Sequence, residues 1–203
     1  MGELNIVLYG DSNTYGYSPY GNRYINRYSQ VLKGLLGNSY KVFEEGVVGR
    51  TTIYDDYRKG RKGIDTVSAE LSKYNKIDLL VVMLGTNDYK IKNARTNDEL
   101  EFGMKAFINK IKSFDNIKKI LLVSPILLAD NIEELDQEFD NHSYNLSVIA
   151  SNIYKSIAIN NELLFFDAKN IAYAGVDGEH LTEAGHKSLG NALAEIIINN
   201  IRI

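Results

Sequence analysis

The chain has 203 residues, a formal net charge of −3 and no cysteine, with 44% hydrophobic and 24% charged residues. This length and balance are typical of one compact domain over residues 1–203, and they exclude a fibrous or largely disordered chain. The scattered basic residues argue against nucleic acid as a partner, and the lack of cysteine excludes disulfides and thiolate chemistry.

Short apolar runs alternate with segments of helical period along the whole chain. Continuous apolar runs such as Leu79–Leu84 are typical of parallel strands that are buried on both faces. The sequence therefore predicts a three-layer α/β/α sandwich with a mainly parallel, five-stranded sheet in a flavodoxin-like order. The predicted strands lie at 4–9, 41–43, 78–84, 119–124 and 163–166, and the predicted helical faces at 28–36, 64–74, 100–111, 146–157 and 189–197.

Two segments, 54–63 and 126–141, fit neither the strand pattern nor the helix pattern. The first is polar and basic, and the second is acidic after an apolar start. Long loops on such a sheet often shape a binding site, so we expect these two to do so.

Polar residues and glycines follow four of the five predicted strands. Ligands of a parallel sheet bind beyond the carboxyl ends of its strands, so we expect these residues to meet in one site. The blocks are Gly10-Asp11-Ser12-Asn13, Gly46-Val47-Val48-Gly49-Arg50, Gly85-Thr86-Asn87-Asp88 and Asp177-Gly178-Glu179-His180.

Ser12 is a candidate nucleophile because the glycine at position 10 allows a substrate to approach the backbone closely. An isolated Gly-Asp-Ser fits a helix cap or a turn equally well. Asp177 and His180 lie three residues apart, so the carboxylate can hold one imidazole nitrogen while the other accepts the Ser12 proton. Read alone, this pair also fits a turn followed by a solvated histidine. His142 and His186 lie in less suitable contexts.

Attack by a serine creates an oxyanion, which needs hydrogen-bond donors placed near the developing charge. The candidates are the backbone N–H groups of Ser12 and Gly49 and the side-chain amide of Asn87. Each of the last two residues, read singly, also fits an ordinary turn.

Together, the four blocks resemble those of the SGNH hydrolases, often called GDSL-type esterases. Their order and spacing fit the family over nearly the whole chain. Within it, the chain is most similar to the cytoplasmic arylesterase and acyltransferase branch, through Glu44-Glu45-Gly46, Arg50-Thr51-Thr52, Met83–Asp88 and Phe166-Asp167-Ala168. Asn13 departs from the pattern, because the GDSL name expects leucine there.

The resemblance implies a metal-independent, cofactor-free serine ester hydrolase with Ser12, Asp177 and His180 as catalytic residues. It implies a small-molecule ester as substrate, with a short acyl group on an aryl, alkyl or sugar alcohol, and acyl transfer to alcohols as a second outcome. Candidate pocket residues are Asp11, Asn13, Tyr15 and Ile126, with Tyr17, Leu127 and Leu128 as further wall positions.

Two other functions fit parts of the sequence less well than the esterase. A metal-dependent phosphoesterase would need several imidazoles and an Asp-x-His near the first strand, whereas Ser12 and Asn13 follow Asp11. A non-catalytic nucleotide-binding or signalling module of flavodoxin-like fold would be expected to carry a glycine-rich phosphate loop, and neither common form of that loop occurs in the sequence.

No apolar run approaches the roughly 18 residues that a membrane span needs. The N-terminal Met1-Gly2-Glu3-Leu4 lacks the basic and apolar regions of a secretion signal. We therefore expect a cytoplasmic protein, and the sequence is compatible with a homo-oligomer.

Overall fold

Five parallel strands form one sheet in the computed structural model, which describes residues 3–201. The strand order is β2-β1-β3-β4-β5, and all four pairings are parallel. The predicted flavodoxin-like α/β fold is confirmed. The predicted domain covers residues 1–203, of which Met1-Gly2 and residues 202–203 lie outside the described residues. The strands are β1 (Leu4–Gly10), β2 (Tyr40–Gly46), β3 (Leu79–Met83), β4 (Ile120–Val123) and β5 (Leu164–Phe166).

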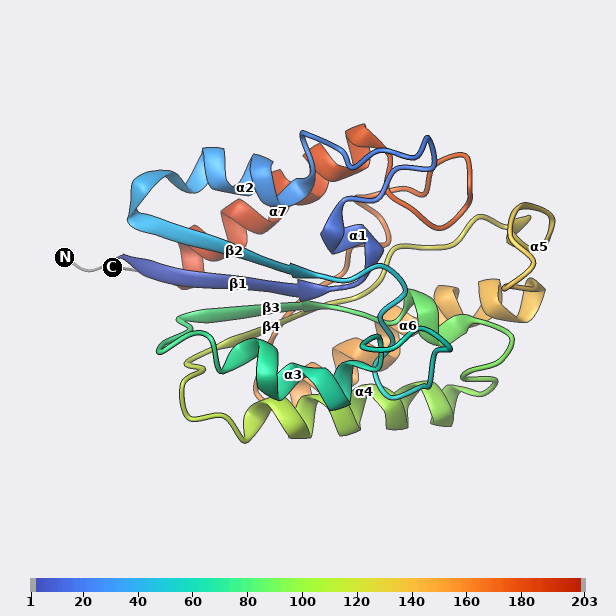
Figure 1. Ribbon diagram of the computed structural model, residues 1–203, viewed down its shortest axis with the longest axis horizontal. Coiled ribbons are helices and arrows are strands. Elements are labelled where there is room, and N and C mark those ends of the chain that lie inside the picture. The colour runs from blue at the N-terminus through green and yellow to red at the C-terminus, as the bar shows by residue number, and fades with distance from the viewer. Residues whose placement is uncertain (1–2, 202–203) are drawn as a thin grey trace.

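Helices cover both faces of the sheet, which gives the three predicted layers (Figure 1). Three of them, α3, α4 and α6, lie on one face, and α2 and α7 lie on the other. These five helices are α2 (Tyr28–Leu36), α3 (Gly63–Leu71), α4 (Asn97–Lys112), α6 (Asn141–Asn160) and α7 (Glu183–Asn200). The shorter elements are α1 (Ser12–Tyr15), α5 (Ile132–Leu135) and the 3-10 turns η1 (Gly37–Ser39) and η2 (Thr86–Tyr89).

Strand β3 runs through the middle of the core, and all five of its residues are buried. Successive side chains of a strand point to opposite faces, so Leu80 and Val82 lie in the apolar cluster that contains Phe107 of α4, while Val81 lies in the cluster that contains Leu189 of α7. Each such side chain stabilises the fold by about 1.5–3 kcal/mol when fully buried. The apolar continuity of this run is therefore explained by helices on both sides.

Side-chain caps fix where α4, α6 and α7 begin. At the start of α4, Thr96 and Glu99 form a reciprocal capping box. At the start of α7, the hydroxyl of Thr182 accepts a hydrogen bond from Gly185 N at 2.9 Å. This last cap anchors the segment that precedes α7, which carries His180.

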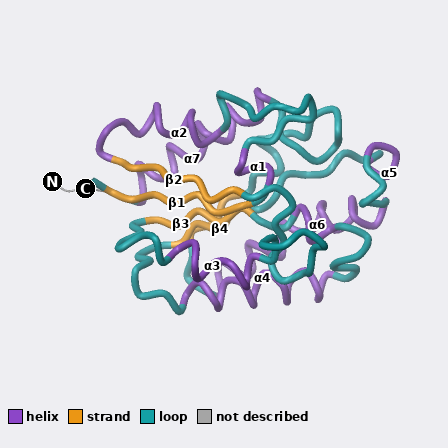
Figure 2. Tube along the Cα trace, viewed as in Figure 1, coloured by secondary structure: helices purple, strands orange, loops and turns teal. Residues whose placement is uncertain are grey.

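The longer loops gather at the carboxyl ends of the strands (Figure 2). The 126–141 segment, which the sequence left unassigned, contains the short helix α5 at this end of the molecule (Figure 1). Within residues 3–201, no helix is both long enough and apolar enough to cross a bilayer.

Candidate active site

Ser12 is the first residue of α1 and follows β1 after a single capping residue. The carboxylate of that residue, Asp11, accepts a hydrogen bond from Asn13 N at 2.9 Å. The helix ends after one turn at Gly16, whose φ of 84° favours glycine. Because the first amides of a helix have no partner within it, the N–H of Ser12 is available to a ligand. The Ser12 side chain makes no hydrogen bond to any residue within 3–201, and the residue is 3% exposed.

Asp177 holds His180 through the side chain and the backbone. Its Oδ2 lies 2.8 Å from Nδ1 of the imidazole, and its Oδ1 accepts from the backbone N of His180 at 3.1 Å. The ring of Tyr17 packs against the imidazole with 4.4 Å between centroids. Nε2 of His180 forms no hydrogen bond with the described part of the chain, so this nitrogen is the one that can exchange a proton with a reacting group.

Three carboxylates influence the protonation of His180. Burial disfavours the imidazolium, but the hydrogen bond to Asp177 and the charges of Glu179 and Asp11 outweigh it, so the pKa of His180 is raised. Burial also opposes ionisation of Asp177, yet its hydrogen bond with His180 keeps the Asp177 pKa below the ordinary value. Glu179 Oε1 lies 3.6 Å from the same Nδ1, and burial raises the pKa of Glu179 to about 7.

Asn13 links the serine block to the histidine block. Its Oδ1 accepts a hydrogen bond from Leu181 N at 2.8 Å, and its Nδ2 donates to Glu179 O at 3.1 Å. The residue is 1% exposed. Both polar atoms of this side chain therefore hold the backbone on either side of His180 next to α1, and neither points to solvent.

The two further donor residues, Gly49 and Asn87, are tied together. Asn87 Nδ2 donates to Arg50 O at 3.1 Å. The carboxylate of Asp88 accepts from both the backbone N and the hydroxyl of Thr52, and burial raises the pKa of Asp88 to about 7. No hydrogen bond within the described residues uses the N–H of Gly49. The amides of Gly49 and Asn87 are thus held by adjoining segments, with donors left for a ligand.

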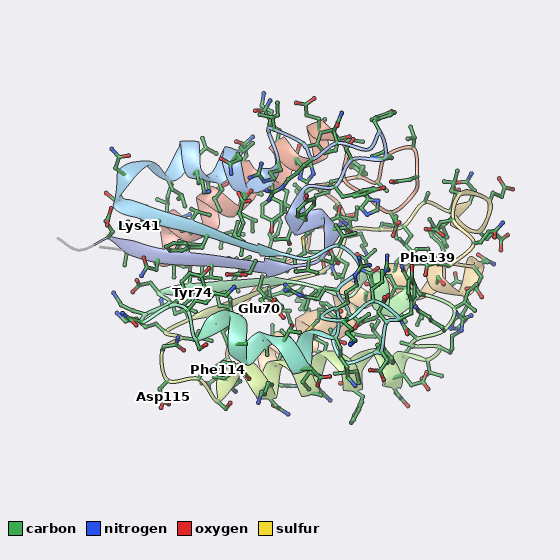
Figure 3. The ribbon with its side chains drawn as sticks, in the orientation of Figure 1. Lys41, Glu70, Tyr74, Phe114, Asp115 and Phe139 are labelled. Carbon is green, nitrogen blue, oxygen red and sulfur yellow. The ribbon has the colours of Figure 1, made fainter. Side chains whose placement is uncertain are left out.

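Arg50 lies beneath this corner and is fully buried. Its guanidinium donates to the backbone carbonyls of Gly10 and Glu45 at the ends of β1 and β2. It also pairs with Glu70 at 2.5 Å and lies over the ring of Tyr9 at 4.0 Å. Figure 3 labels Glu70 on α3, below the sheet. Arg50 therefore connects the ends of β1 and β2 to α3, next to the residues proposed to bind the oxyanion.

The other predicted pocket residues occupy different environments. Asp11 is 1% exposed, and burial raises its pKa to about 6. Tyr15 exposes about a third of its surface and lies under the guanidinium of Arg23 at 4.4 Å. Ile126 is fully buried in the core between the sheet and the α2/α7 layer. Asp11 thus lies next to the serine, Tyr15 is open to solvent, and Ile126 exposes no surface.

The remaining histidines and the nearest alternative acid are engaged elsewhere. His142 contacts Arg95 O through Nε2, and buried His186 accepts from Tyr28 N at 3.3 Å. Burial lowers the pKa of His186 to about 4. Asp167 accepts from Ser124 Oγ and from Lys169 N, each at 3.0 Å. Among the described residues, no group of three or more acidic, histidine or cysteine side chains is arranged to hold a metal ion.

Sequence reasoning did not assign roles to Asp88, Thr52, Arg50 or Glu179, although all four stand inside the blocks it singled out. A buried charge cannot be recognised from an isolated sequence, because its partner lies on another segment. The one available signal was that each block carries a charged residue directly beside a candidate site residue or one position away from it.

The chain matches the model of the GDSL-like lipase/acylhydrolase family over residues 8–187. No curated protein matches it. Among solved structures, it is similar to an aryl esterase from M. smegmatis, with 30% identity, a TM-score of 0.86, and coverage of 97% of this chain and 99% of that one. It is also similar to a carbohydrate acetylesterase from Sinorhizobium meliloti, with 29% identity, a TM-score of 0.87 and the same coverage. A lipase/acylhydrolase from Enterococcus faecalis, at 18% identity and a TM-score of 0.70 over 98% of this chain and 97% of that one, shares the fold.

Proposed function

Because the chain belongs to the GDSL-like lipase/acylhydrolase family and is a carboxylic ester hydrolase, we propose that it cleaves short-chain esters through an acyl-enzyme on Ser12. The observation that carries this proposal is the pair of hydrogen bonds between the Asn13 side chain and the backbone on either side of His180, one donated to Glu179 O and one accepted from Leu181 N. They hold the histidine and its partner Asp177 beside the helix that begins with Ser12. The family membership favours this reading over the phosphoesterase and the nucleotide-binding module.

In the proposed first step, Ser12 Oγ attacks the ester carbonyl carbon while Nε2 of His180 takes the hydroxyl proton. Asp177 stabilises the imidazolium through Nδ1. The carbonyl oxygen becomes an oxyanion and accepts hydrogen bonds from the N–H groups of Ser12 and Gly49 and from Asn87. His180 then gives its proton to the leaving alcohol, whose bond to carbon breaks, and the acyl group stays on Ser12.

In the second step, water replaces the alcohol. His180 removes a proton from the water, which attacks the acyl carbon. As the bond from that carbon to Ser12 Oγ breaks, His180 returns the proton to Oγ, and the carboxylic acid and free Ser12 are released. A second alcohol that takes the place of water receives the acyl group, and this gives transfer in place of hydrolysis.

A short acyl group fits the enclosure of the site. Ser12 and Asn87 are each 3% exposed, so the two residues proposed to act on the ester carbonyl present little surface to solvent. The similar structures are named an aryl esterase and a carbohydrate acetylesterase. Aryl acetates, short alkyl esters and acetylated sugars are therefore the substrates to test first, and the proposed partner is a small molecule.

A fluorophosphonate probe tests the nucleophile directly. Stoichiometric labelling at Ser12, located by peptide mass spectrometry, is expected together with loss of p-nitrophenyl acetate hydrolysis. Ser18, a buried serine in the loop after α1, is the internal control and should stay unlabelled. Activity that is lost with EDTA and restored by a divalent cation, without labelling of Ser12, would overturn the proposal and favour metal-dependent chemistry.

A further inference from the structure

The segment between β2 and α3, residues 47–62, returns to the proposed oxyanion site. Thr51 N donates to Arg61 O at 2.9 Å, so the end of the segment pairs with the residues just after Gly49. A Cβ added to Gly49 would collide with Nη1 of Arg61 and would lie 2.9 Å from Nη2 of Arg58. Two guanidinium groups therefore stand directly over the residue whose N–H is proposed to bind the oxyanion.

Only one of these two arginines is neutralised by a carboxylate. Arg58 bonds to Asp56 through Nε at 2.9 Å and through Nη2 at 3.1 Å. Arg61 has no ion pair and no side-chain hydrogen bond within residues 3–201, and its Nη1 is buried without a partner. Burial and the neighbouring charge of Arg58 lower the pKa of Arg61. A buried N–H without an acceptor costs free energy that a bound anion would recover.

The surroundings of Arg61 carry an excess of positive charge. Lys90 pairs with Glu138, and Lys92 lies 3.6 Å from the Asp56 carboxylate that already holds Arg58. With Arg58 and Arg61, four cations share two ion-paired carboxylates, and the charge of Lys90 also acts on the carboxylate of Glu179. Such an excess of positive charge attracts and orients anions.

The position of these arginines distinguishes the two halves of an ester. The leaving alcohol must lie next to His180, whose segment lies on the α2/α7 side of the molecule (Figure 1). The arginine segment lies on the opposite side, where the Tyr54 hydroxyl donates to Glu99 O of α4 at 2.9 Å (Figure 1). A substrate group that reaches Arg61 therefore belongs to the acyl half.

We propose that Arg61, assisted by Arg58, binds a carboxylate at the far end of the acyl chain, so that half-esters of short dicarboxylic acids are favoured substrates. The proposal rests on the acyl-enzyme chemistry proposed for Ser12. The guanidinium fork matches a carboxylate, which it binds through two parallel hydrogen bonds. Substrate recognition then includes the 54–63 segment, which carries both arginines.

The test compares monoethyl glutarate with ethyl pentanoate, which have the same chain length and leaving group and differ in the terminal carboxylate. Acid release in a pH-stat gives kcat/KM for both esters. The wild type should favour the glutarate half-ester by about tenfold or more, the expected gain from a charge-assisted hydrogen bond, and 0.5 M NaCl should reduce the preference. Arg61→Gln should abolish the preference, and Arg61→Lys should restore part of it.

The matched control is Lys59→Gln, which makes the same charge change at an exposed position of the same segment. It should keep the wild-type preference.

Equal kcat/KM values for the two esters in the wild type would overturn the proposal without any variant. An equal fall for both esters in Arg61→Gln would also overturn it, because Arg61 would then act on the reaction centre. A preference for 4-acetoxybenzoate over phenyl acetate, with none for the glutarate half-ester, would assign the arginine to the leaving group instead. Failure of the Ser12 chemistry has a different signature: neither ester is turned over, or Ser12→Ala retains the wild-type rate.

Discussion

Asn13 and Leu181 are joined by a 2.8 Å hydrogen bond from the backbone N–H of Leu181 to the side-chain oxygen of Asn13. These residues directly follow Ser12 and His180 in the sequence. Each is therefore one peptide unit from a residue proposed to act in catalysis. The bond fixes the relative position of two chain segments that no strand pairing connects.

Replacing Asn13 with leucine, the residue that the GDSL name expects, removes both hydrogen bonds to the histidine segment. We expect Asn13→Leu to lower kcat by about 10²-fold, because a shift of about 1 Å in a reacting group costs that much. KM should change far less, since His180 acts in proton transfer and not in binding the ground-state ester. The control is Asn145→Leu, the same change at an exposed position of α6. A kcat for Asn13→Leu within twofold of the control would show that position 13 does not position His180.

Removal of the proposed nucleophile should abolish turnover and spare the fold. Ser12→Ala is expected to lower kcat by more than about 10⁴-fold. Its Tm should stay within about 2 °C of the wild type, because the hydroxyl has no hydrogen-bond partner within residues 3–201. Differential scanning calorimetry and a p-nitrophenyl acetate assay check the two statements. Turnover near the wild-type level in freshly purified variant protein would rule out Ser12.

Asn87 is proposed to act only on the oxyanion, so its loss should appear in kcat more than in KM. Asn87→Ala is expected to lower kcat by about 10²–10³-fold, or about 3–4 kcal/mol. Asn93, whose side chain donates to Asn87 O at 2.7 Å, provides the control for local loosening through Asn93→Ala. A change confined to KM in Asn87→Ala would contradict the oxyanion role.

The pH dependence of kcat/KM should follow His180, which must be neutral to accept the Ser12 proton. Its pKa is raised because the Asp177 hydrogen bond and nearby carboxylates outweigh burial. Imidazolium therefore persists to higher pH, and activity on a neutral ester should rise with pH through a midpoint above the ordinary value of about 6.5. Asp177→Asn should lower this midpoint and lower kcat by up to about 10⁴-fold.

A change at Glu179 separates the effect of nearby negative charge on the His180 pKa from the orientation of His180 by Asp177. Glu179→Gln removes a carboxylate 3.6 Å from Nδ1 and leaves the Asp177 bond in place. The midpoint should fall, while kcat at high pH should stay within about threefold of the wild type. If instead Asp177→Asn leaves midpoint and rate unchanged, Asp177 is not the partner of His180.

Glu44 should contribute to stability at neutral pH and lose that contribution in acid. Burial opposes its ionisation, but hydrogen bonds from Ser29 and Arg27 outweigh burial and lower its pKa to about 2. A depressed carboxyl pKa stabilises the fold above the unfolded-state value, and the contribution is lost as pH falls through the folded-state value. The shift corresponds to about 3 kcal/mol. Urea titrations should show Glu44→Gln less stable by roughly this amount at pH 6 and equal to wild type near pH 2. A constant difference across this range would exclude the charge as its cause.

The sequence predicted the strands and the five long helices because each is an apolar run or face that must be buried. Leu79–Met83 illustrates this, since all five residues are buried. The four-residue helices α1 and α5 were not predicted, because periodicity needs more than one turn. Helix α1 depends on the Asp11 cap and on the close approach of β2, where a Cβ on Gly46 would overlap the backbone of Thr14 and Tyr15.

The sequence also predicted that four blocks follow the strands and meet, and the structure brings them together. The catalytic roles of their residues stay predictions. The cross-links between blocks could not be predicted, because they join segments far apart in the chain. Arg50 reaches Gly10 O across 40 residues, and Asn13 reaches Leu181 across 168. Neither partner is visible in a local pattern.

His180 follows β5, so the ribosome makes it after all five strands of the sheet. During synthesis, β1 to β4 and the serine block emerge well before the segment that contacts Asn13. A nascent chain, or one cut short by interrupted translation before residue 177, carries Ser12 without its proposed base. Such fragments are expected to be inert rather than partly active, so hydrolysis begins only after synthesis has passed residue 180.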